Sequence, residues 1–154
     1  MFYPTLLFLH SIFRWLAISS IAVSIFLSLK GYLARSENFP RLHNALRHTT
    51  ATIAHIQLML GILIYTKSPV VKDFYADPVK DFDDSFFFGL VHIALMLTAV
   101  ILITIGSAKA KRQEGANGKY KMILAYFTAA LLLIFIAVPW PFSPLAQRPI
   151  LRTL

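Results

Sequence analysis

The chain contains no cysteine. Without thiolates there is no disulfide, no cysteine-ligated metal or iron–sulfur site, and no covalently attached c-type haem. Charged residues are scarce too, at 14% of the chain against roughly 25% in ordinary globular proteins. Hydrophobic residues make up 57% of the 154 positions, and so small a soluble domain has too little interior to hide them. The composition therefore excludes an ordinary soluble protein and indicates one that lies in a bilayer.

The apolar residues gather in four long segments. We expect each to be a helix, at about residues 5–33, 46–66, 85–108 and 120–138. Each is near or above the roughly 20 residues that a helix needs to cross the hydrocarbon core. The loops between them are short and leave no room for a separate soluble domain. The pattern predicts an all-α fold, an integral membrane up-down four-helix bundle, with residues 1–154 forming a single membrane domain.

Local signals mark the ends of these segments. Pro4 suits the first turn of a helix, where its missing N–H costs nothing. Asp84 or Ser85 is expected to cap the third helix, and Pro139 begins a group of three prolines that end the fourth. The stretch 115–118 has a glycine at each end and is typical of a flexible turn. The first four residues carry no positive charge, so we expect the apolar run after them to stay as a helix and not to be a signal peptide.

The charges between the segments predict an orientation. Residues 30–47 hold four Lys or Arg and one acidic residue, and residues 109–121 hold five Lys or Arg and one acidic residue. Residues 67–84 hold three Lys and five Asp. Because basic loops stay in the cytoplasm, we expect the first and third loops there and both termini on the outer, periplasmic side. Arg148 and Arg152, in the tail, oppose this weakly.

The net charge of +8 has the same explanation. A basic balance often indicates nucleic acid. Here the basic residues lie in short segments between apolar runs, which is the pattern of membrane topology. We expect contact with membrane lipid and none with nucleic acid.

Three of the five histidines lie inside apolar segments: His10, His55 and His92 are expected on the first, second and third helices. Ionisable residues at that depth are costly and indicate function. Arg14 lies one turn beyond His10 on the same helix face. The other two histidines, at 43 and 48, belong to the first loop or the edge of the second helix, where we expect them to be solvated or to face the lipid headgroups.

Histidines on separate helices, without cysteine and without acids in the helices, fit haem b. Its iron takes two neutral imidazoles, and its ring faces suit apolar side chains. By the helical rise, His10 and His92 each lie roughly 8–9 Å below the outer edge and His55 roughly 16 Å. The first two match best, but uncertain helix ends leave the pair of iron ligands open. One haem is favoured over two, because a fourth ligand at His48 would lie only about 10 Å from His55.

Other readings of these residues stay open. Buried histidines also bond helices together, so a haem-free polar cluster, a quinone site or another metal are alternatives. Arg14 fits a haem propionate or a quinone oxygen, or it extends toward the membrane surface or bonds backbone carbonyls. Gln57 is expected to bond between helices, Trp15 to pack on a cofactor or a helix, and Met96 to pack in the core or ligate iron. No residue is assigned a catalytic role.

The sequence resembles a family of small bacterial four-helix membrane proteins labelled "cytochrome B". The similar segments are 9–15 (LHSIFRW), 54–58 (AHIQL) with Gly61, 91–93 (VHI), 103–107 (ITIGS) and 139–142 (PWPF). The resemblance implies a b-type haem protein of the bacterial inner membrane. The chain lacks the four-histidine arrangement of larger di-haem quinol-oxidising cytochromes.

Two functions follow as expectations. The first is a b-type haem protein in respiratory electron transfer with quinol, alone or with other membrane subunits, whose haem is held by two of His10, His55 and His92, with Arg14 beside it. The alternative is a haem-free accessory subunit that stabilises a membrane assembly. Its basis is the small size of the chain and the lack of an extramembrane domain.

Overall fold

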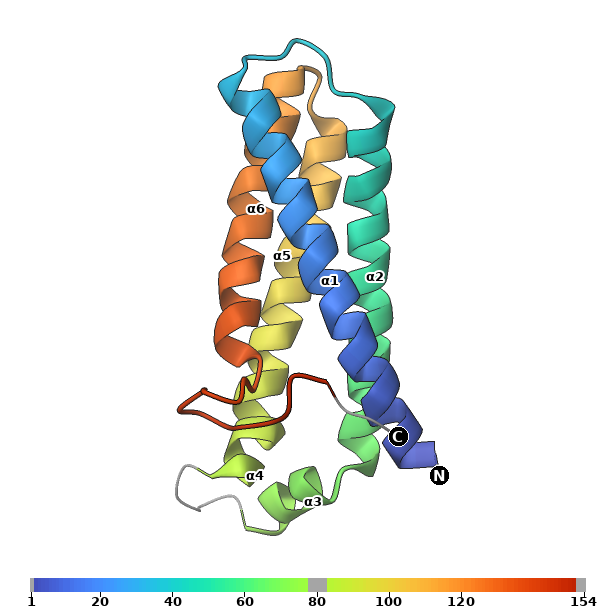
Figure 1. Ribbon diagram of the computed structural model, residues 1–154, viewed down its shortest axis with the longest axis vertical. Coiled ribbons are helices and arrows are strands. Elements are labelled where there is room, and N and C mark those ends of the chain that lie inside the picture. Colours follow the sequence, from blue (N-terminus) through green and yellow to red (C-terminus); the bar gives the residue numbers. More distant parts are fainter. Residues whose placement is uncertain (1, 78–82, 152–154) are drawn as a thin grey trace.

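Four long helices make up most of the protein (Figure 1), whose computed structural model describes residues 2–77 and 83–151. They are α1 (Phe2–Leu33), α2 (Arg41–Lys67), α5 (His92–Arg112) and α6 (Ala116–Ala137). Three short segments lie between α2 and α5, namely α3 (Pro69–Ala76), α4 (Asp84–Phe86) and the π-helix η1 (Phe87–Val91). The described residues contain no strand, which confirms the all-α prediction.

The four long helices run up and down in sequence order. Each contacts two others: α1 packs on α2 and α6, and α5 also packs on α2 and α6. The start of α1, the segments α3 and α4, and the tail of residues 138–151 lie at one end of the bundle (Figure 1). The loops at 34–40 and 113–115 lie at the other end. The predicted up-down four-helix bundle is therefore confirmed.

The outside of the bundle is apolar. Phe26 of α1, Ile101 of α5 and Leu132 of α6 are 65%, 54% and 61% exposed. Four spans are long and apolar enough to cross a membrane: α1, α2, the continuous stretch Asp84–Arg112, and α6. Helices whose backbone groups bond internally and whose outer side chains are apolar are stable in lipid. The protein is a multi-pass membrane protein with a lipid-facing surface.

Three helices begin earlier than the hydropathy predicts. α1, α2 and α6 begin at Phe2, Arg41 and Ala116, against expected starts at 5, 46 and 120. Hydropathy marks the part of a helix that lies in the bilayer and not its polar extension. The prediction of a turn over 115–118 is wrong, because only Gly115 precedes α6.

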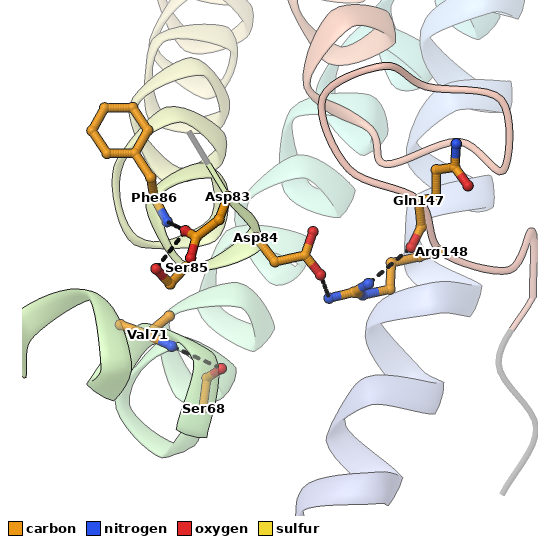
Figure 2. A network of polar contacts seen from close by, with 8 residues as sticks. All are labelled: Ser68, Val71, Asp83, Asp84, Ser85, Phe86, Gln147 and Arg148. Atoms are coloured by element: carbon orange, nitrogen blue, oxygen red, sulfur yellow. Dashed lines mark hydrogen bonds and ion pairs between the residues drawn. The ribbon is translucent and has the colours of Figure 1, made fainter. Parts of the chain in front are cut away.

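The start of the third span is capped one residue earlier than expected. The side chain of Asp83 accepts hydrogen bonds from the Phe86 N–H at 2.9 Å and from the Ser85 hydroxyl at 2.6 Å (Figure 2). Asp83, and not Asp84 or Ser85, is therefore the N-cap. Helix α2 ends at Lys67, before Pro69. Pro69 is the first residue of α3, whose N-cap is Ser68 (Figure 2).

The helices meet closely where glycine removes a side chain. A Cβ added at Gly106 of α5 would lie 2.3 Å from the Cβ of Tyr126 in α6. Small residues allow such contacts between membrane helices. Farther toward the loop end, buried Arg47 of α2 donates to the Ser107 carbonyl at 2.8 Å and hydroxyl at 2.5 Å. These contacts hold α5 against both of its neighbours.

Basic residues of the first and third loops share one end of the bundle, as the up-down order requires. Arg152 and residues 78–82 of the acidic second loop lie outside the described residues. The predicted orientation stays a prediction.

Candidate functional site

A cavity of about 210 Å³ lies among the helices, in the half of the bundle nearer the start of α1. Most of its wall, which is largely aliphatic, comes from α1, α2, η1, α5 and the end of α6. The tail adds Val138, Pro139, Arg148 and Pro149. The polar side chains on the wall are those of Tyr3, His10, Ser11, Arg14, Gln57, Tyr65, Ser68, His92 and Arg148. Among the described residues, no Asp or Glu lines it. A partly apolar, cationic cavity of this kind suits an amphipathic ligand.

His92 reaches the cavity from the first residue of α5. Its Nδ1 lies 2.8 Å from the carbonyl oxygen of Ala137, at the end of α6. That contact fits an Nδ1–H donor, which leaves Nε2 as the basic nitrogen. The π-helix η1 directly precedes it, and such wide turns are frequent at functional sites. The Tyr65 hydroxyl donates to the Gly89 carbonyl within this turn at 2.7 Å.

His10 faces the same cavity from α1. The amide nitrogen of Gln57 in α2 lies 3.2 Å from its Nε2 and donates to its backbone carbonyl at 3.1 Å. Gln57 thus bonds between helices, as predicted. Within the described part of the chain, the buried Nδ1 of His10 and Oε1 of Gln57 have no hydrogen-bond partner. Leaving buried polar atoms without hydrogen bonds costs free energy. This corner of the cavity therefore suits a ligand that carries polar groups or a metal ion.

The structure brings His10, His92 and Arg14 together. All three line the cavity, and they lie close enough to interact electrostatically. The Arg14 guanidinium donates to the Ile150 carbonyl in the tail and lies 3.5 Å from the Ser11 hydroxyl. Two imidazoles and a guanidinium therefore share one apolar enclosure.

His55 lies elsewhere. Its side chain is exposed on the outside of the bundle, away from the cavity wall. Its Nε2 lies 3.1 Å from the Thr104 hydroxyl of α5, which itself donates to the Val100 carbonyl. The structure does not bring His55 together with His10 and His92.

The remaining two histidines do not line the cavity either. His43 packs in an aromatic cluster with Phe39 and Tyr120, with ring centroids 5.5 and 5.7 Å away. His48 is exposed. Among the described residues, no group of three His, Asp or Glu side chains is placed to hold a metal ion. The two histidines on the cavity wall are His10 and His92.

Sequence reasoning missed the contribution of the tail. The Trp15 indole donates to the Ile150 carbonyl at 3.1 Å, and its ring meets the Trp140 ring edge-on at 5.9 Å. Trp15 therefore packs on the tail. Arg148 brings a second cation to the cavity wall and pairs with Asp84 at 2.6 Å (Figure 2). The one available signal was a pair of bulky aromatics and an arginine in a proline-rich segment.

Met96 also lines the cavity, one turn beyond His92. It takes part in the packing around the hydrophobic core, against residues such as Ile103. Core packing, one of the two roles expected for it, is therefore confirmed.

Comparisons with models of known protein families, with curated proteins and with solved structures found no match. The resemblance to small bacterial "cytochrome B" proteins stays a prediction. The fold and the cavity are consequently the basis on which a function is assigned.

Proposed function

We propose that the protein is a b-type haem protein of the bacterial inner membrane that takes part in respiratory electron transfer with quinol, alone or with other membrane subunits. The observation that carries the proposal is that His10 and His92, from two different helices, line one apolar cavity. Six-coordinate haem b needs two such imidazoles. The proposal includes the predicted orientation, with both termini in the periplasm.

The donor set fits haem. Histidines that ligate metals commonly donate their second ring N–H to a carbonyl or carboxylate, and His92 lies in this way against Ala137. His10 offers a buried nitrogen, Nδ1, that has no partner among the described residues. Nδ1 would bind iron with the Gln57 amide turned so that its Oε1 accepts from the Nε2–H of His10. The aliphatic wall suits the faces of a porphyrin, and Arg14 offers a cation for a propionate.

Each group has a part in holding the ligand. His10 and His92 would hold the iron, Gln57 would fix the ring of His10, and the aliphatic wall would exclude water. Bound haem would supply reversible one-electron oxidation and reduction. Most of the described chain belongs to helices that can span a membrane, so quinol, which diffuses within the bilayer, is the proposed partner.

The test is a reduced-minus-oxidised absorption spectrum of the purified protein, expressed with ample haem. We expect the bands of low-spin b-type haem at one haem per chain. Absence of haem bands in well-folded protein would contradict the proposal. Stable co-purification of that haem-free protein with other subunits would then favour the accessory-subunit alternative.

A further inference from the structure

Two arginines border the cavity, and they come from opposite ends of the sequence. Arg14 belongs to α1 and Arg148 to the tail. We infer that the two guanidinium groups together bind a ligand with two carboxylates. This inference rests on the proposed function, in which the two carboxylates are the haem propionates. It adds the tail to the binding site and assigns it a recognition role.

One contact of Arg14 is with a neutral acceptor in the tail. Its Nη2 and the Trp15 indole both donate to the Ile150 carbonyl. A carboxylate binds a guanidinium more strongly than a neutral oxygen does, because it adds its own charge and can accept two parallel hydrogen bonds. A propionate in the cavity would therefore compete well for Arg14 without displacing the Trp15 bond.

Arg148 is connected to His92 through the ring of Phe88. Its guanidinium stacks over the Phe88 ring at 4.9 Å, and the centroid of that ring is 5.8 Å from the His92 ring. Its present anion is Asp84, whose side chain is 48% exposed (Figure 2). Ion pairs this exposed contribute little stability, so Arg148 can exchange Asp84 for a carboxylate at small cost.

The charge of the cavity wall agrees with this assignment. Among the described residues, the wall holds two arginines and no acid. An apolar enclosure strengthens the attraction between such cations and an anionic ligand. A neutral ligand of the same shape would gain none of it.

The experiment compares haem b with its dimethyl ester, whose shape and iron are the same but whose carboxylates carry no charge. Each is titrated into purified haem-free protein in detergent, and the Soret shift gives its Kd. We expect haem b to bind at least about tenfold more tightly than the ester, since a hydrogen-bonded charge contributes on this scale. Equal affinity of the two would overturn the inference while leaving the haem proposal intact. Failure of both to bind would contradict the haem proposal itself.

Variants then assign the effect to residues. Arg14→Gln and Arg148→Gln should each lower the preference for haem b over the ester, and Arg112→Gln, at the exposed far end of α5, should not. Asp84→Asn breaks the ion pair of Arg148 but keeps its charge, so it should preserve or raise haem affinity. If Asp84→Asn weakened the binding of haem b as much as Arg148→Gln does, Arg148 would act by holding the tail. Its role in recognition would then be refuted.

Discussion

Each polar side chain on the cavity wall has to be considered against the cost of burying it in a bilayer. Some of these groups have hydrogen-bond partners. The Tyr65 hydroxyl, for example, donates to the Gly89 carbonyl and lies 2.9 Å from the Tyr75 hydroxyl. The ring of His10 is not fully paired, because its Nδ1 lacks a partner among the described residues. The Oε1 of Gln57 lacks one too. A ligand adds most stability at these two unpaired atoms.

Tyr65→Phe removes the hydroxyl that bonds the π-helix before His92. We expect the free energy of unfolding to fall by about 1 kcal/mol, the usual contribution of one such bond. Tyr75→Phe is the matched control, because it leaves the bond to Gly89 in place, and it should change stability by less than about 0.5 kcal/mol. Reversible unfolding in mixed detergent measures both. An equal loss in the two variants would show that the bond to Gly89 is unimportant.

At the residue scale, sequence reasoning could find the buried histidines but not their directions. Position along a helix gives depth, and by depth His10 and His92 were the best match. The direction in which a side chain points needs an amphipathic pattern, which spanning helices lack because both lipid and core are apolar. Thus His55 stayed a candidate ligand in spite of its different depth, although its side chain is on the outside of the bundle.

Helix elements approach one another at small residues, and Gly106 is the clearest case. Gly106→Ala would place a Cβ 2.3 Å from the Tyr126 Cβ, so α5 and α6 must separate. We expect a loss of about 1–3 kcal/mol, as for other overpacked sites. At Gly61 the nearest atom is the His10 Cε1 at 3.4 Å, an ordinary contact, and Gly61→Ala should cost less. The opposite order in unfolding measurements would contradict the packing of α5 on α6.

Arg47 joins α2 to α5 at the end opposite the cavity. Arg47→Met removes its two bonds to Ser107, and we expect stability to fall by about 1.5–3 kcal/mol, the range for charged hydrogen bonds. Haem content should not change, because the cavity lies in the other half of the bundle. Arg41→Met, at an exposed position on the same helix, is the control. Loss of haem in Arg47→Met, with stability unchanged, would contradict the separation of the Arg47 contacts from the haem cavity.

At the element scale, hydropathy predicted all four spans but not the elements at their ends. Helix α2 starts at Arg41 because Pro40 ends the preceding loop, and polar residues continue the helix beyond its apolar part. The π-helix η1 and the folded tail have no simple sequence signature. Their form depends on tertiary bonds such as those of Tyr65 and Arg14.

The orientation of the whole molecule can be tested because the chain has no cysteine. Single cysteines at Gln147, in the tail, and Glu114, in the third loop, both replace exposed residues. With both termini in the periplasm, a membrane-impermeant maleimide should label Gln147→Cys in intact cells. It should label Glu114→Cys only after the inner membrane is opened. The reverse pattern would contradict the proposed orientation.

The most direct test of the whole account is the haem spectrum of three histidine variants, each purified beside the unaltered protein. His10→Ala and His92→Ala each remove a proposed iron ligand, whereas His55→Ala removes a histidine that lies outside the cavity wall. We predict that the first two lose the low-spin six-coordinate spectrum and that His55→Ala keeps it with unchanged haem content. Full haem binding in His10→Ala and His92→Ala, or its loss in His55→Ala alone, would contradict the proposed site.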